Sequence, residues 1–160
     1  MRAKVPAPGD LLSGVTLPSL TGGAAANLRS GRGPRALVIL HSGRCPECLH
    51  YVGTELVRAL DQVREWGGRL AVVVPGGPGD ARELARIVPA GIELLGDPEA
   101  RLASGRAAVV IVDEWGEVYF ASGAAGAHDL PGSLDIRDWI RFLAIQCPEC
   151  EGPEGGWRTL

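Results

Sequence analysis

The chain has 160 residues, of which 46% are hydrophobic and 22% are charged, and its net charge at neutral pH is −3. This length and composition are typical of one globular domain with a substantial core, and they exclude a disordered or fibrous chain. The basic residues are scattered along the sequence and form no positive stripe, so nucleic acid is not expected as a partner.

The N-terminal ten residues, MRAKVPAPGD, contain no apolar segment of signal-peptide length. Nowhere does the sequence approach the roughly 20 apolar residues that a membrane-spanning helix needs. We therefore expect no membrane partner and a cytoplasmic location. In that reducing compartment a permanent structural disulfide is unusual, so paired cysteines are expected to be redox-active or metal-binding.

The first predicted elements are a strand and a long helix. Residues 36–41 (ALVILH) form a continuous apolar run, as in a strand buried on both faces. From residue 46 to residue 66 the apolar side chains recur at helical spacing, and Gly67 follows. This pattern predicts an amphipathic helix of about five turns.

The alternation of strand and helix continues in the middle of the chain. Residues 70–74 predict a second buried strand. Asp80 and Glu83, three positions apart, have the spacing of a capping box and predict a short helix over residues 81–88.

The last predicted elements are a hairpin and a helix. Two β-rich runs, 107–112 and 117–120, are joined by a four-residue connection that ends in Gly, which predicts antiparallel strands and hence a mixed sheet. Residues 134–146 carry one apolar stripe and predict a helix with Ser133 as its N-cap.

Two copies of the tetrapeptide Cys-Pro-Glu-Cys contain all four cysteines of the chain. The first copy begins at Cys45, between the predicted strand and the long helix. The second begins at Cys147, in a tail rich in Gly and Pro. We therefore expect a domain over residues 1–146 and a C-terminal tail over residues 147–160.

The position of the first copy predicts different roles for its two thiols. Cys45 should lie at or next to the helix N-cap, with Pro46 at the first helical position, where a missing N–H has no cost. Free N–H groups and the positive end of the helix dipole then favour a thiolate, and Arg44 would add to this with its side chain turned inward. Cys48, one turn into the helix, is placed to attack a mixed disulfide on Cys45.

The order of strand, CPEC, helix, strand, helix, hairpin and helix over residues 6–146 resembles the thioredoxin fold. The opening PAPGDLLSGVTLPSLTGG resembles the N-terminal extension of the AhpC/TSA redoxin superfamily, which includes peroxiredoxins and ResA-like thiol-disulfide oxidoreductases. A Cys-x-x-Cys at a strand-to-helix junction is the most specific part of this resemblance. It implies an α/β fold with a mixed central sheet flanked by helices.

Several positions depart from the family patterns. Thioredoxins usually carry Trp before the first cysteine, where this chain has Arg44, and a cis-proline before the hairpin strand, where counting back from the turn gives Ala108. In the peroxiredoxin pattern Ser42 fills the hydroxyl position, but Val38 stands where proline belongs. Arg106 is one residue out of register with the peroxide-polarising arginine of peroxiredoxins.

The resemblance and the residues favour a thiol-disulfide oxidoreductase with Cys45 as nucleophile and Cys48 as resolving thiol. A thiol peroxidase is the first alternative: Cys45 would become a sulfenic acid, resolved by Cys48 or by Cys147 or Cys150, with Ser42 and Arg106 holding the peroxide. His41, at the strand end, could exchange a proton with the Cys45 thiolate, or be a structural histidine.

A second alternative is a non-catalytic domain stabilised by zinc. All four cysteines could provide a tetrahedral site, although the two pairs are 102 residues apart, well beyond the usual spacing. For the favoured function no cofactor is expected. The expected partners are a protein disulfide or a peroxide as substrate and a thioredoxin-type reductant, and a homodimer is left open.

Overall fold

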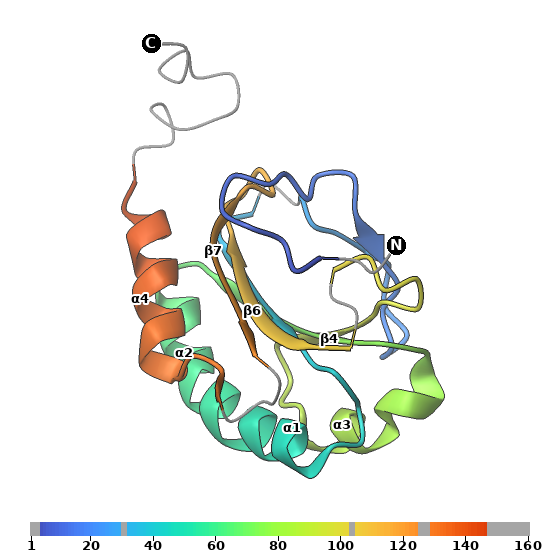
Figure 1. The fold of residues 1–160 in the computed structure, drawn as a ribbon. Helices are drawn as coiled ribbons and strands as arrows, with labels where there is room; N and C mark the ends of the chain where they lie inside the picture. Colours follow the sequence, from blue (N-terminus) through green and yellow to red (C-terminus); the bar gives the residue numbers. More distant parts are fainter. Residues whose placement is uncertain (1–3, 30–31, 103–104, 125–128, 147–160) are drawn as a thin grey trace.

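The central feature of the computed structural model is a five-stranded sheet with the order β5-β4-β3-β6-β7 (Figure 1). The structure describes residues 4–29, 32–102, 105–124 and 129–146. The first three strands along the chain are parallel, and the last two are antiparallel to their neighbours. The predicted mixed sheet is thus confirmed. Its strands are β3 (Arg35–Ile39), β4 (Arg69–Val74), β5 (Ile92–Gly96), β6 (Ala107–Val112) and β7 (Val118–Ala124).

The sheet separates two hydrophobic cores, because successive side chains of a strand point to opposite faces. In β3, Ala36 and Val38 face the helices, whereas Leu37 and Ile39 face the N-terminal segment. All five residues of β3 are buried, which explains the continuous apolar run in the sequence. Figure 1 shows α1, α2 and α4 on one side of the sheet and the N-terminal segment on the other.

The N-terminal segment covers the second face of the sheet. Leu12, Leu17 and Leu28 are buried there. A small antiparallel pair, β1 (Thr16–Leu17) and β2 (Ala26–Asn27), shapes this covering.

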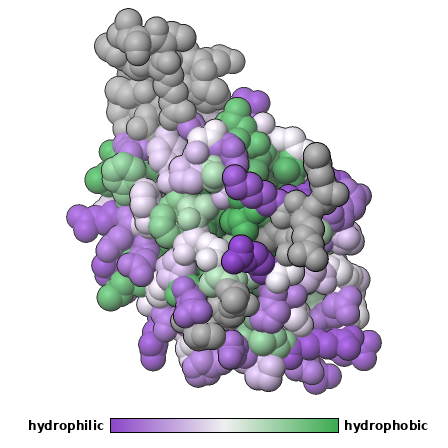
Figure 2. All heavy atoms as spheres, in the orientation of Figure 1, coloured by the Kyte–Doolittle hydropathy of each residue, from purple (hydrophilic) through white to green (hydrophobic). Residues whose placement is uncertain are grey.

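Figure 2 shows hydrophilic residues around most of the periphery of the molecule and hydrophobic residues nearer its centre. Among the described residues no helix is long and apolar enough to cross a bilayer.

The helical segment after β3 has the predicted extent but not a uniform geometry. It consists of α1 (Pro46–Tyr51), a π-helical turn η1 (Val52–Leu56) and α2 (Val57–Glu65). A π turn inside a helix is rare and is frequently found at functional sites. Here it carries Glu55, whose carboxylate accepts a hydrogen bond of 2.8 Å from the backbone N–H of Ser133.

That hydrogen bond caps α4 (Ser133–Ala144), whose N-cap differs from the predicted one. Gly132, rather than Ser133, is the N-cap residue. The side chain that satisfies the Ser133 N–H comes from Glu55, far away in the sequence, so Ser133 itself does not need to cap the helix.

The region between β4 and β6 differs most from the prediction. A 3₁₀ turn, η2 (Pro78–Ala81), precedes α3 (Arg82–Ile87), so Asp80 lies inside that turn and is not the N-cap of the predicted helix. Its carboxylate accepts from the Gly77 N–H at 3.4 Å. Strand β5 was not predicted, since Glu93 interrupts its apolar run; that carboxylate pairs with Arg35 on β3 and Arg69 on β4, at 3.5 and 3.6 Å.

Candidate functional site

The first Cys-x-x-Cys lies where the chain leaves β3 and enters α1. Cys45 is the N-cap residue of α1, with extended backbone angles (φ −67°, ψ 126°), and Pro46 takes the first helical position. The Cys45 carbonyl accepts the first helical hydrogen bond, from the Leu49 N–H at 3.0 Å. Both placements were predicted, because a proline after a strand is typical of a helix start.

The two thiols differ in exposure. Cys48 is fully buried in the core under the helices, at 0% exposure, whereas Cys45 is half-buried at its rim. Both are free cysteines. A substrate from solution therefore meets the sulfur of Cys45 first, and the sulfur of Cys48 lies behind it.

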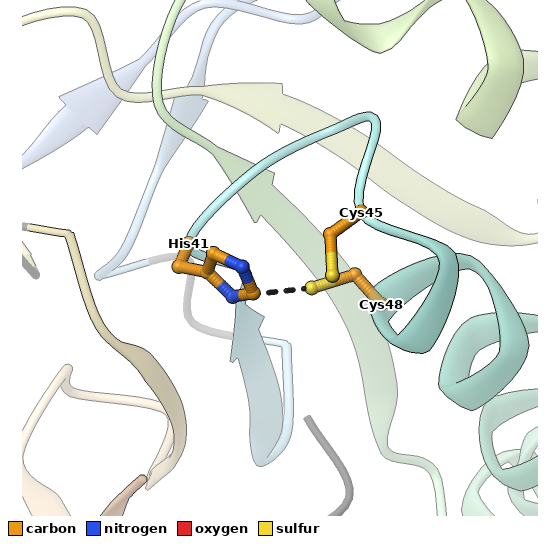
Figure 3. Close-up of side chains that lie close together, drawn as sticks. All are labelled: His41, Cys45 and Cys48. Atoms are coloured by element: carbon orange, nitrogen blue, oxygen red, sulfur yellow. Dashed lines mark hydrogen bonds between the residues drawn. The ribbon is translucent and has the colours of Figure 1, made fainter. Parts of the chain in front are cut away.

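His41 joins the two cysteines in one cluster. Its Nδ1 lies 3.4 Å from the sulfur of Cys48. The ring nitrogen and the two sulfurs all lie within 4.8 Å of one another. Figure 3 shows the three side chains close together between the end of β3 and the start of α1. From the sequence, His41 could either exchange a proton with the Cys45 thiolate or be a structural histidine; in the structure its hydrogen-bond contact is with Cys48.

The environment of Cys48 holds its proton firmly. Burial raises the pKa of the Cys48 thiol to about 11, and the nearby charge and hydrogen bond of Cys45 act in the same direction. Backbone hydrogen bonds from Ser42 and His41 oppose this only in part. Cys48 is thus a thiol at neutral pH and needs a proton acceptor before it can react.

This protonation predicts that the reduced protein loses stability in alkaline solution. Burial also raises the pKa of Tyr51, whose hydroxyl donates to the Pro131 carbonyl. Above about pH 9 the unfolded chain releases the Cys48 proton while the folded chain retains it, so stability falls as pH rises towards 11. The Cys48 contribution is on the order of 2 kcal/mol. Denaturant unfolding of wild type and Cys48→Ala between pH 7 and 11 measures this contribution. If the free energy of unfolding fell equally with pH in both proteins, Cys48 would not be the source of the alkaline destabilisation.

The loop that presents Cys45 rests directly on η2. A Cβ atom placed on Gly43 would lie 2.1 Å from the Asp80 carbonyl oxygen, so only glycine allows this approach. Beside it, the Arg44 guanidinium pairs with the Asp80 carboxylate at 3.4 Å and is largely exposed. Arg44 is therefore directed towards Asp80 instead of inward. The hydroxyl oxygen of Ser42 accepts from the Arg44 N–H at 3.1 Å and holds the loop.

Gly43→Ala is expected to push this loop off η2, lowering stability by about 1–3 kcal/mol and slowing the reaction of Cys45 with a chromogenic disulfide. Gly53→Ala is the matched control, because a Cβ at this exposed position meets nothing within 4 Å. The control should match or slightly exceed the wild-type melting temperature. Equal thiol reactivity in both variants would show that the loop contact does not position Cys45.

Solved structures resemble this arrangement over most of the chain. AhpC from Mycobacterium tuberculosis superposes with a TM-score of 0.71 at 14% identity, covering 91% of this chain and 98% of that one. A thiol peroxidase from Chromobacterium violaceum gives 0.64 at 21% identity, covering 88% and 89%. No family profile and no curated protein matches the sequence. The chain has the thioredoxin-like fold of the peroxiredoxins.

Within this peroxiredoxin fold the register of β3 and β6 corrects one expected position. Ala108 pairs with Ile39 and packs in the core under the N-terminal segment, on the opposite face from the cysteines. It does not occupy the facing position that counting along the sequence gave it. Continuing the register two residues beyond the last pair would bring exposed Arg106 opposite His41.

A groove that was not predicted begins at Pro46, the residue after Cys45. It has a volume of about 480 Å³ and runs along α1 and η1 to the start of α4. Its lining is mixed, with more apolar than polar surface, and the residues are Pro46, Glu47, His50, Tyr51, Thr54, Glu55, Leu130 and Gly132. They come from two segments about 80 residues apart, so no local pattern could reveal the groove.

Cys147 and Cys150 lie outside the described residues. Gln146, the last residue described, lines a hollow together with Trp66, just beyond the end of α2. Cys45 lies at the other end of the same helical segment, which has 20 residues from Pro46 to Glu65. At about 1.5 Å per residue the segment is about 30 Å long.

Proposed function

We propose that this protein is a thiol-based redox enzyme, and specifically a thiol-disulfide oxidoreductase. The observation that carries the proposal is the pairing of an accessible sulfur on Cys45 with a buried sulfur on Cys48, within 4.8 Å and one helical turn. A disulfide between these positions needs only a small movement of the side chains.

In the proposed reaction the Cys45 thiolate attacks one sulfur of a substrate disulfide. A Cys45–substrate disulfide forms, and the other half of the substrate leaves as a thiolate. Cys48 then gives its proton to His41 and attacks the Cys45 sulfur. The Cys45–Cys48 disulfide forms and the second half of the substrate leaves, so the substrate gains two electrons and the protein loses two. A thioredoxin-type dithiol returns them.

The groove beside Pro46 supports a disulfide within a polypeptide as the substrate. Its volume, about 480 Å³, lies in the range of pockets that bind ligands much larger than a peroxide. A chain extended along α1 would place its disulfide next to Cys45.

The position of Cys48 also makes it the proposed resolving thiol. A chain adds at most about 3.6 Å per residue, so Cys150, four residues after Gln146, would reach about 14 Å from it. That is short of the roughly 30 Å length of the helical segment that separates Gln146 from Cys45.

A peroxidase is the second candidate, and the similarity to the thiol peroxidase from Chromobacterium violaceum favours it. Cys45 would attack a peroxide oxygen and become a sulfenic acid as water or an alcohol leaves; Cys48 would then form the disulfide and release water. Ser42 and Arg106 are the side chains proposed to hold the peroxide. Val38, buried in β3 where the peroxiredoxin pattern has proline, departs from this function.

The deciding experiment compares two oxidants on reduced, metal-free protein. One equivalent of oxidised glutathione is expected to give a Cys45–Cys48 disulfide, identified by alkylation and peptide mass spectrometry. Hydrogen peroxide is expected to react no faster than with a free thiol. Rapid oxidation of Cys45 by peroxide, absent in Cys45→Ser, would replace the oxidoreductase with the peroxidase.

A further inference from the structure

We propose that the reduced centre also binds a thiophilic cation, Zn²⁺ or Cu⁺, through His41, Cys45 and Cys48. All three ligand atoms lie within 4.8 Å of one another. Imidazole and thiolate are the ligands that these ions prefer, whereas Mg²⁺ and Ca²⁺ prefer oxygen. This site differs from the four-cysteine zinc site considered from the sequence, because it needs no residue of the tail.

The spacing of the ligand atoms suits such an ion. With Zn–S near 2.3 Å and Zn–N near 2.0–2.1 Å, tetrahedral geometry separates a nitrogen and a sulfur ligand by about 3.5 Å. The observed distance between His41 Nδ1 and the Cys48 sulfur is 3.4 Å. One edge of the coordination polyhedron is thus already formed, and Cys45, at the exposed end of the cluster, would complete a triangular face.

The way the ligands are held also favours binding. His41 lies two residues beyond the end of β3, and both cysteines belong to the first turn of α1, so the three donors are presented at the ends of two regular elements. His41 and Cys45 are both half-buried, which leaves the fourth position open towards solvent. Three protein ligands and an open position are typical of sites that admit a further ligand, in contrast to closed structural zinc sites.

The cation and the disulfide compete for the same two sulfurs, and this consequence rests on the proposed function. Oxidised glutathione takes two electrons from the two bound thiolates. The Cys45–Cys48 disulfide forms, two glutathione thiolates leave, and the cation is released because the disulfide no longer offers thiolate ligands. The centre would then hold the ion only while reduced, and the bound ion would slow the reaction of Cys45 with oxidants without preventing it.

The test uses the full chain carrying Cys147→Ser and Cys150→Ser, so that the second CPEC cannot bind metal. Reduced, chelator-treated protein is titrated with Co²⁺, whose thiolate charge-transfer bands report sulfur ligation, and then with Zn²⁺ to displace it. A separate titration uses Cu⁺ against a chromophoric chelator. We expect one ion per chain, no thiolate bands in Cys45→Ser, and at least tenfold weaker binding in His41→Ala.

His50→Ala is the matched control, because His50 is an exposed histidine on the same helix, and its binding should equal that of the parent. Circular dichroism verifies that each variant folds. Failure of all three ions to bind, or binding unchanged in His41→Ala and Cys45→Ser, would overturn the site. The tighter of Zn²⁺ and Cu⁺ identifies the preferred ion.

A final addition separates this inference from the proposed function. Oxidised glutathione added to the Co²⁺-loaded protein should abolish the thiolate bands and release the ion. Retention of the ion beside a formed Cys45–Cys48 disulfide would overturn the coupling. If the cation binds but no oxidant reacts with Cys45 in the metal-free protein, the proposed function fails and the metal site stands. If the disulfide forms but no ion binds, the metal site fails and the proposed function stands.

Discussion

Cys45→Ser is expected to abolish disulfide reduction, whereas Cys48→Ala is expected to stop the reaction one step later. Without the Cys45 sulfur no mixed disulfide forms, and the rate should fall by a factor on the order of 10³ or more. Without Cys48 the first attack still occurs, because Cys45 remains accessible at the start of α1. The substrate then stays attached to Cys45.

Mass spectrometry of each variant after oxidised glutathione tests this order. Cys48→Ala should accumulate one glutathione on Cys45, released by an added dithiol, and Cys45→Ser should accumulate none. The double variant Cys147→Ser, Cys150→Ser is the control and should turn over like wild type. If the control instead accumulated the glutathione adduct while Cys48→Ala turned over like wild type, the tail would be the source of the resolving thiol.

The features that the sequence predicted correctly are those that neighbouring residues determine. The buried strand before Cys45, the proline after it and the helical spacing that follows lie within one short stretch, so they place Cys45 at the N-cap without knowledge of the remaining chain. The hairpin of β6 and β7 depends on two β-rich runs and a turn, which are equally local.

The features that were missed depend on residues distant in the sequence. The π turn carries Glu55 to the Ser133 N–H across 78 positions, and no helical periodicity reveals such a partner. Arg44 is drawn away from the thiols by Asp80, which is 36 positions away. Ala108 was misplaced because counting along the chain cannot give the register between strands, which sets the face of every side chain.

His41 shows the same limit within the candidate site itself. His41 precedes both cysteines by only a few residues, so sequence spacing does not show which sulfur it contacts. The burial of Cys48 in the core, beside the His41 ring, decides this. This difference changes the expected chemistry. In the proposed reaction, a histidine beside the buried thiol would act on the second step, the release of the substrate, and would leave the first attack to Cys45.

His41→Ala is therefore expected to slow the resolution of the mixed disulfide while leaving its formation near the wild-type rate. Cys48 must lose a proton before it attacks, and burial, the first cause of its raised pKa, persists when Cys45 is bound to substrate. A neutral imidazole with its proton on Nε2 can accept that proton at Nδ1, which lies 3.4 Å away. Removing such a base typically costs at least about 10²-fold in rate.

The dependence on pH distinguishes this role from a structural one. As pH rises, hydroxide deprotonates Cys48 without help, so the difference between His41→Ala and wild type should shrink. Rapid-quench measurement of the glutathione adduct from pH 6 to 10 follows both steps, with Gly53→Ala, which lies outside the lining of the groove, expected to match wild type. A deficit in His41→Ala that is the same at every pH would mean that His41 only holds the loop in place. Because the imidazole would be both the base for Cys48 and a ligand of the proposed cation, bound metal should slow the resolution step as well as the first attack by Cys45.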